Sequence, residues 1–306
     1  MRTRTAETRI VKVKAHSGVR GNEEADRLAN LGSEGSPEGF PDLEVPQEWS
    51  LGGARLSSLS FREMYAWVRS TKKLDQTNGA LRNLDKIKEH LRDEHNRIVT
   101  DGDIWLSLRR PYIRREISDF LWKMIHERSP CGTMFSNWGP GWEDLQYCEC
   151  GAVESMEHIQ MGCGPDIWKI RLWEEACTMM KASKIIEDKL ITIRPTYESL
   201  MAVSVVKAKS PTATRLWATI TSETAFTVWK LRNRRRFDGI RITARMAIDM
   251  WLSNMEKRAR SDLAITRLKG TKTAPELKRT NEMHAAWTTI ATWKSGMLYW
   301  IYADHG

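Results

Sequence analysis

The 306-residue sequence predicts a mainly α-helical protein, with a short strand, loop and helix at its N-terminus and a small cysteine-rich segment near its middle. From about residue 54 onward, apolar residues recur at helical spacing, which predicts amphipathic helices. Ahead of that region, apolar and basic residues alternate from Ile10 to Lys14, which predicts a strand. Three of the five cysteines fall between Cys148 and Cys163, and the five follow no secretory disulfide framework.

The composition indicates a soluble, intracellular protein that contacts a polyanion. The formal net charge is +9 and the isoelectric point is near 9.3, so nucleic acid is the partner that the charge favours. The N-terminus lacks the apolar core of a signal peptide, and no apolar run reaches the length that spans a membrane. We therefore expect a nuclear or cytoplasmic protein that is not secreted and makes no membrane contact.

The densest pattern of polar residues lies between Val13 and Gly32. After the predicted strand, a His-Ser-Gly loop holds His16, and we expect Asn22 to cap a helix with two glutamates in its first turn. Asp26 follows one turn later, so we expect Asp26 and His16 to face one site. Such a pair suits metal-assisted hydrolysis, whereas either residue alone, without the surrounding motif, is more typical of a solvated surface.

This stretch resembles the C-terminal motif of the type 1 ribonucleases H, the domain that cuts RNA–DNA hybrids in many reverse transcriptases. The resemblance rests on His16, the corner from Gly21 to Glu23, Asp26, and Leu28 with its neighbouring alanine, which we expect to bury the helix. In that family, four carboxylates hold two divalent ions, Mg²⁺ or Mn²⁺, that activate water. The resemblance implies that Asp26 is the last of these metal ligands and that His16 assists proton transfer or product release. It also implies that Asn22 contacts nucleic acid.

The other three carboxylates of that family lie upstream of the motif, where this sequence has only Glu7. A lone aspartate binds Mg²⁺ weakly, because that ion keeps its waters unless several oxygens converge on it. We therefore expect this chain to be the C-terminal portion of a retrotransposon-derived protein, whose N-terminal ribonuclease H and reverse transcriptase part is a candidate partner. Alone, the chain is expected not to hydrolyse RNA–DNA hybrids.

Composition divides the first half of the chain into three parts. Residues 1–32 form the ribonuclease-like piece, and a linker rich in Gly, Pro and Ser is expected over residues 33–53. A helical region follows over residues 54–130. Within it, Thr100 is expected to start a helix, and an apolar stripe from Ile113 to Ile125 predicts another.

Residues 131–166 contain a second group of candidate functional residues. Three thiols and one imidazole lie close together in sequence, at Cys148, Cys150, His158 and Cys163. Such a set satisfies tetrahedral zinc. We expect Gly151 to allow a tight turn, and the residues from Glu154 to His158 to form a helical turn that brings the imidazole back to the cysteines. A small reduced core made of the same four residues is the alternative.

This segment is similar to the zinc-binding region that follows reverse transcriptase and ribonuclease H modules in retrotransposon-derived proteins, the fungal members above all. The likeness rests on the Phe-Leu-Trp-Lys run at residues 120–123, the cysteines, and the stretch from Glu154 to Ile159. The family commonly separates its first two cysteines by two residues, whereas only Glu149 separates them here. Cys131 and Cys177 are expected to be ordinary buried residues.

Residues 167–306 are predicted to be basic and helical to the end of the chain. One long helix ends in an arginine cluster that we expect to contact the polyanion, formed by Arg232, Arg234, Arg235 and Arg236. The same cluster fits a nuclear import signal. Trp217, Trp229 and Trp251 fall on or beside apolar stripes, so we expect them to pack in the core rather than to stack on bases. A last helix is predicted around Ala285 to Trp293.

Three functions stay open from the sequence. The first is a remnant or subunit of a retroelement ribonuclease H, which cuts only if another polypeptide supplies the missing carboxylates. The second is a nucleic-acid-binding module without nuclease activity, which holds an RNA–DNA hybrid or RNA through the cysteine segment and the basic helices. The third is an inert fragment that folds through its helices.

Overall fold

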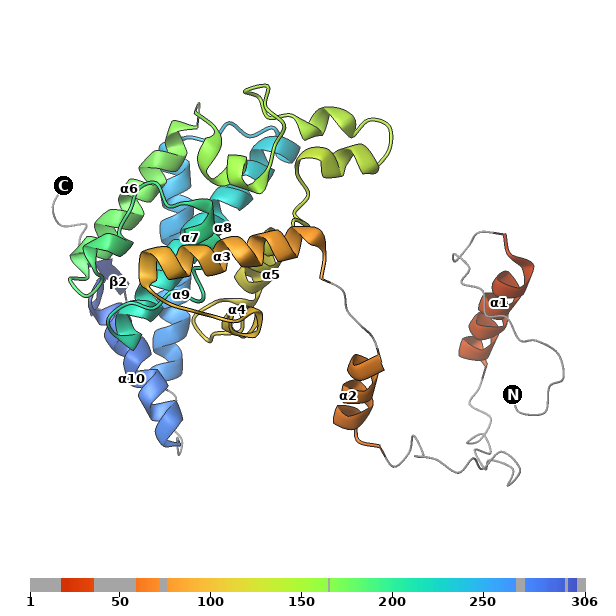
Figure 1. Cartoon of the computed structure of the whole chain (residues 1–306), viewed down its shortest axis with the longest axis horizontal. Helices are drawn as coiled ribbons and strands as arrows, with labels where there is room; N and C mark the ends of the chain where they lie inside the picture. Colours follow the sequence, from red (N-terminus) through yellow and green to blue (C-terminus); the bar gives the residue numbers. More distant parts are fainter. Residues whose placement is uncertain are drawn as a thin grey trace. The chain divides into compact units, whose positions relative to one another are not determined.

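The computed structural model describes residues 18–35, 59–71, 76–164, 166–267, 273–294 and 297–301. This part of the chain is mainly helical, as predicted, and Figure 1 shows the order of its elements. The chain separates into two units, Met1–Leu74 and Asp75–Gly306. Within the described ranges, no helix combines the length and the apolar character that crossing a bilayer requires.

The first unit contains helices α1 (Arg20–Glu34) and α2 (Phe61–Thr71). Helix α1 begins before Asn22. The amides of Asn22 and Glu23 donate to the Val19 carbonyl at 2.9 and 3.0 Å, and the Gly18 amide donates to the Glu23 carboxylate at 3.2 Å. Asn22 therefore lies inside the helix, and the prediction that it caps the helix is wrong.

Helix α1 is exposed along its length. Leu28 is 55% exposed and none of the residues of α1 is buried, so the prediction that Leu28 and its neighbour bury the helix is wrong for the described residues. A leucine is buried only where another element covers it. The predicted strand from Ile10 to Lys14, His16 and residues 36–53 of the predicted linker lie outside the described residues. The helix continues through Glu34, so the first two residues of that linker are helical.

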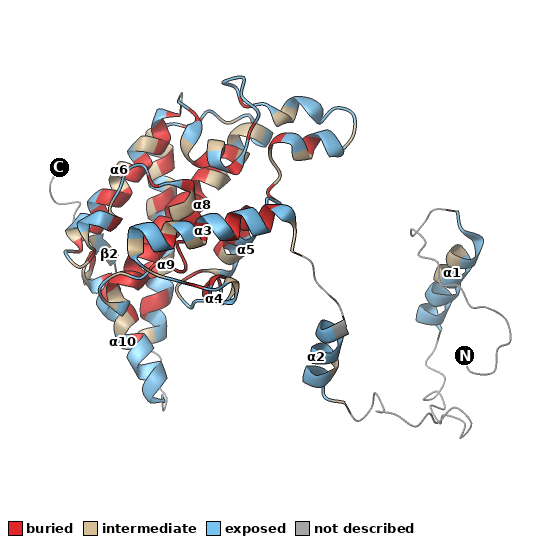
Figure 2. Cartoon of the chain, in the orientation of Figure 1, coloured by how far each residue is buried: buried red, intermediate tan, exposed pale blue. Residues whose placement is uncertain are grey.

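The second unit is built around helix α8 (Pro211–Asp238). Five helices pack against it: α5 (Arg115–Ile125), α6 (Ile167–Ala182), α7 (Tyr197–Met201), α9 (Ala244–Arg267) and α10 (Ala274–Thr288). Helix α3 (Asn78–His95) packs against α5 and α7, and helix α4 (Asp101–Ser107) adds Ile104 to the same core. Figure 2 shows the buried residues concentrated where these helices meet.

Helix α8 is capped at both termini, and other helices cover its flanks. The Ser210 hydroxyl accepts a hydrogen bond from the Ala213 amide at 3.0 Å, and the helix ends at Gly239, whose φ is +66°. Every residue from 213 to 225 is buried, which is typical of a helix surrounded by other helices. Trp217 and Trp251 are 4% and 0% exposed, which confirms that these two residues pack in the core.

The buried charges around α8 are paired, as burial of charge requires. Arg114 donates two hydrogen bonds to the Glu223 carboxylate, at 2.6 and 2.7 Å. The Asp262 carboxylate of α9 accepts from Trp287 of α10 at 3.0 Å and from Arg215 of α8 at 3.4 Å. The Asp262 carboxylate therefore links α9 to both α8 and α10.

Helix α4 confirms the predicted helix start at Thr100. The Thr100 hydroxyl accepts a hydrogen bond from the Asp103 amide at 3.2 Å, and the Asp103 carboxylate accepts one from the Thr100 amide at 2.9 Å. These reciprocal bonds form a capping box, in which each residue satisfies an amide that the helix leaves open.

The C-terminal stretch differs from the prediction. Helix α10 ends at Thr288, and strands β1 (Ala291–Lys294) and β2 (Met297–Trp300) form an antiparallel pair in which Ala291 faces Trp300. The predicted last helix is present, but it begins and ends earlier than the range from Ala285 to Trp293, and the prediction of helix to the end of the chain is wrong. The strand sequences, ATWK and MLYW, carry threonine and aromatic side chains that favour a pleated surface.

Candidate metal centre

The cysteine segment folds as a short hairpin followed by a helical turn. An antiparallel bridge closes the hairpin, and the Cys148 amide donates to the Ala152 carbonyl at 2.8 Å. Inside it, the Gly151 amide donates to the Cys148 carbonyl at 2.8 Å, and Gly151 has φ +84°, which glycine adopts without strain. Gly151 therefore makes the predicted tight turn, which presents Cys148 and Cys150 together.

A helical turn returns the imidazole to these cysteines, as predicted. The Ser155 hydroxyl accepts a hydrogen bond from the His158 amide at 3.0 Å, which starts the turn. The wide turn η5 (His158–Gly162) packs on α8 and leads directly into Cys163. Gly162 leaves room for the ring, because a Cβ atom there would lie 3.3 Å from His158 Nδ1.

The four candidate ligand atoms lie close together, and two of their separations match those of tetrahedral zinc. All lie within 4.8 Å of one another, the Cys148 and Cys163 sulfurs are 3.6 Å apart, and Cys150 Sγ is 3.5 Å from His158 Nε2. Bonds of about 2.3 Å from zinc to sulfur and about 2.0 Å to nitrogen give ligand separations of roughly 3.5–3.8 Å in a tetrahedron. The four cysteine and histidine side chains could therefore hold a metal ion, and their donor set is consistent with zinc.

The chemical environments of these ligands differ. Burial, followed by the charge of Asp166, raises the pKa of Cys163 to about 12. A hydrogen bond with the backbone of Ala152 lowers the pKa of the exposed Cys150, and burial lowers the pKa of His158. The imidazole is therefore neutral at pH 7 and offers a lone pair, whereas Cys163 becomes a thiolate when a cation displaces its proton. A zinc ion held by all four groups has no open position for a substrate, which defines a structural site.

A buried ion pair joins this segment to α8. The Arg232 guanidinium donates to the Glu154 carboxylate from Nε to Oε1 at 2.9 Å and from Nη2 to Oε2. The two side chains are 1% and 3% exposed. The loop before the hairpin passes close to Glu154 at Gly132, where φ is +57° and a Cβ atom would lie 2.0 Å from the Glu154 carbonyl oxygen. Only glycine fits at that position.

Two further arginines of the predicted cluster also contact the segment. Arg235 pairs with the buried carboxylate of Asp166, three residues after the last cysteine. Burial raises the pKa of Asp166, but Lys169 and Arg235 outweigh that effect and lower the pKa overall. Arg236 donates to a carbonyl of the loop before the hairpin, that of Asp144, at 2.9 Å. Arg234 is exposed.

The predicted role of Arg232 in nucleic acid binding is wrong. Its guanidinium is enclosed by Glu154 and lies 5.4 Å from the Trp229 ring and 5.7 Å from the Phe237 ring, so a phosphate has no access to it. The sequence does contain a signal that Arg232 is buried. Arg232 lies four residues after Val228, on the buried stripe of α8, whereas Arg234 lies off that stripe.

The predicted catalytic pair lies only partly within the described residues, so it stays a prediction. Asp26 lies on α1 together with Asn22, and both are partly exposed, whereas His16 lies outside the described residues. Among the described residues, the cysteine–histidine cluster is the one group of three or more potential metal ligands. Asp26 therefore belongs to no group of three or more potential ligands among the described residues, whereas Mg²⁺ requires several converging oxygens.

Comparisons of the chain with models of protein families, with curated proteins and with solved structures gave no match. The likeness to ribonuclease H proteins therefore rests on the motifs in the sequence. The chemistry of the cysteine–histidine cluster and of its surroundings is the main guide to function.

We expect the purified chain to bind one zinc ion through this cluster. The Cys148→Ser variant should lose the metal and unfold at a lower temperature, because a closed tetrahedral site depends on every ligand and its binding energy stabilises the fold. Metal analysis gives the zinc content, and the absorption spectrum of the Co²⁺-substituted protein reports tetrahedral sulfur ligation. Cys177→Ser, which alters a buried cysteine of α6 outside the cluster, is the matched control. Equal zinc content in the Cys148 variant and the wild type would contradict the assignment.

Proposed function

We propose that this chain is a nucleic-acid-binding protein stabilised by a structural zinc ion and derived from a retroelement ribonuclease H. The observation that carries this proposal is the cysteine–histidine cluster, docked on the arginine-rich end of α8 beside exposed aromatic rings. The motif that contains His16 and Asp26 supplies the family link. The net charge of +9 favours a polyanionic partner.

The proposed contact surface consists of Trp138, Trp142, Phe237, Arg234 and Arg236, and we name it the aromatic–arginine surface. Its three rings are 48%, 39% and 48% exposed, in that order. The Trp138 and Trp142 rings meet edge to face, with centroids 5.1 Å apart, and Arg236 donates to a carbonyl of the same loop. Arg234 precedes Phe237 by three residues on α8, so the two side chains are neighbours on one face of the helix.

A buried phenylalanine holds these rings in position. The Phe135 ring lies 5.0 Å from that of Trp138 and 6.3 Å from those of Trp142 and Phe237. A preorganised aromatic surface suits a single strand, because stacking on a base contributes about 1–3 kcal/mol and is tolerant of sequence. The exposed guanidinium of Arg234 adds a contact to phosphate. RNA, or an RNA–DNA hybrid with an accessible strand, is the ligand that the family link favours.

Hydrolysis of RNA–DNA hybrids is the second candidate function, and the motif around Asp26 favours it. Two-metal hydrolysis needs several carboxylates around the ions, and Asp26 would be one of them. We infer that the chain alone does not cut, and that a second polypeptide carrying the other carboxylates would be needed. An inert fragment would neither cut nor bind.

We predict that loss of either exposed tryptophan weakens binding to single-stranded RNA roughly tenfold, because each removes one stacking platform. The measurement is fluorescence anisotropy of a labelled RNA titrated with Trp138→Ala or Trp142→Ala. The control is Trp122→Ala, which removes a ring of α5 that is 43% exposed and lies outside the aromatic–arginine surface.

The salt dependence of binding gives an independent readout. Arg234→Ala should reduce the slope of log affinity against log salt by about one, because one phosphate contact is lost. Arg92→Ala, which removes an exposed charge from α3, should leave the slope unchanged. Equal losses in the Trp122 and Arg92 controls, or no binding at low salt, would contradict the proposed surface.

We predict that the purified chain does not cleave a labelled RNA–DNA hybrid in Mg²⁺ or Mn²⁺, because Asp26 alone does not hold two ions. Gel analysis of the labelled strand measures cleavage, and the Asp26→Asn variant distinguishes intrinsic activity from a contaminating nuclease. Cleavage by the wild type that disappears in this variant would show that further carboxylates converge on Asp26, and would establish the hydrolase function instead.

A further inference from the structure

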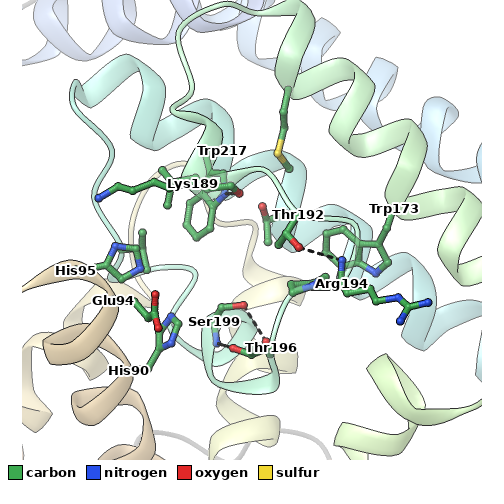
Figure 3. Close-up of a pocket in the computed structure, with 15 residues that line it drawn as sticks. His90, Glu94, His95, Trp173, Lys189, Thr192, Arg194, Thr196, Ser199 and Trp217 are labelled. Atoms are coloured by element: carbon green, nitrogen blue, oxygen red, sulfur yellow. Dashed lines mark hydrogen bonds between the residues drawn. The ribbon is translucent and has the colours of Figure 1, made fainter.

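A cavity of about 280 Å³ lies inside the second unit, away from the residues of the cysteine–histidine cluster. Helices α3, α6, α7 and α8 contribute to its wall, together with the segment that follows the short turn η6 (Asp188–Leu190). Figure 3 shows Lys189 and His95 on one side of this cavity and Trp173 and Arg194 on the other. We name it the α3–α8 cavity.

Three side chains of its wall carry buried polar atoms without a hydrogen-bond partner among the described residues. They are Trp173 Nε1, Thr221 Oγ1 and His90 Nε2. Trp173 and Thr221 are only 3% and 4% exposed, so bulk water does not compensate them. Because buried polar groups are nearly always paired, three orphans around one cavity indicate a missing polar occupant.

Comparable groups close to the cavity do have hydrogen-bond partners. The buried hydroxyls of Thr224 and Thr227 donate to carbonyls of their own helix, at 2.7 and 2.8 Å, and the Trp217 indole donates to the Leu190 carbonyl at 2.9 Å. Thr221 lies on the same helix but makes no such bond among the described residues. Unpartnered buried atoms also occur elsewhere in the described core, as at Trp251 Nε1, so the cavity is distinguished by the grouping of three of them in one wall.

The chemistry of the wall selects the charge of the occupant. An indole N–H can only donate, so Trp173 requires an acceptor. Lys189 and Arg194 add two cationic side chains, against the single carboxylate of Glu94. Burial lowers the pKa of His90, so its ring is neutral at pH 7 and adds no further charge. Donors and positive charge favour an oxyanion, and disfavour a cation.

The remaining wall is apolar. Met180, Leu190, Pro195 and Val206 line the cavity, together with the ring of Trp217. An inorganic ion would leave this surface without contacts, whereas an organic anion with an apolar body would cover it.

We propose that the α3–α8 cavity binds a small organic anion, a carboxylate or a phosphate monoester with an apolar body. The anionic oxygens accept from the Trp173 indole and the Thr221 hydroxyl, with Arg194 and Lys189 balancing the charge. The apolar body lies against Trp217 and Met180. This site is independent of the nucleic acid surface, which uses other residues.

The test is isothermal titration of the full chain with four probes that share one ring and differ in charge. Benzoate and phenyl phosphate are the carboxylate and phosphate sources, benzyl alcohol is neutral, and benzylamine is cationic. We expect saturable binding of at least one of the two anions, and weaker binding of the alcohol and the amine. No saturable binding of either anion at about 10 mM, or equal binding of benzylamine, would overturn the proposal and leave a hydrated cavity.

Two conservative variants locate the bound anion. Trp173→Phe keeps an aromatic ring but removes the indole N–H, and Thr221→Val keeps the shape but removes the hydroxyl. Each should weaken binding of the anion about tenfold, because one hydrogen bond to a charged oxygen is lost.

The matched controls are Trp251→Phe and Thr227→Val, which alter the same residue types in the core outside the cavity. Trp251 also has an unpartnered buried N–H, so it controls for the effect of removing such a group. Both controls should retain wild-type affinity. Affinity that is unchanged in the Trp173 and Thr221 variants, or reduced equally in the controls, would overturn the proposed site.

Discussion

The pairing of Arg232 with Glu154 is the contact on which the arrangement of the candidate metal centre depends. It joins the most enclosed helix of the second unit to a hairpin that has little apolar core of its own. Burial of two charges is favourable only when they satisfy each other, so neither residue tolerates the loss of its partner. The pair therefore fixes where the hairpin lies, and Gly132 permits the close approach of the chain to Glu154.

This contact links the metal site to the fold of the whole second unit. Glu154 follows the hairpin that carries Cys148 and Cys150, and it immediately precedes the turn that carries His158. Asp166 stands three residues after Cys163 and pairs with Arg235, one helical turn beyond Arg232. Ion pairs with α8 thus lie on both sides of the turn that brings His158 back to the cysteines. Metal binding and folding of this segment are expected to be coupled in consequence.

Several features of the protein follow from local sequence. The donor set of the cysteine–histidine cluster, the turn at Gly151 and the helix start at Thr100 are encoded by residues close together in the chain, and all three are as predicted. The role of Arg232 depends on a partner 78 positions away, so the charge pattern alone suggested a surface contact.

Other features leave no clear pattern in the sequence. The start of α1 was misplaced because Val19 and Gly18 supply backbone contacts that no capping side chain signals. The C-terminal strands differ from the predicted helix because short apolar runs carry little periodicity. The α3–α8 cavity joins residues of four helices and a connecting segment, and no motif marks it.

The most direct measurement of the role of Arg232 is a double-mutant cycle with Glu154→Gln and Arg232→Met, followed by zinc affinity and by urea unfolding. Each single variant should lose about 3–5 kcal/mol of stability and bind zinc more weakly, because one buried charge is left unpaired. The double variant should lose much less than the sum of the two single losses. The exposed pair of Arg245 and Asp249 is the control, with an expected coupling below about 1 kcal/mol. Additive losses for Arg232 and Glu154, with unchanged zinc affinity, would contradict the dependence of the metal centre on this pair.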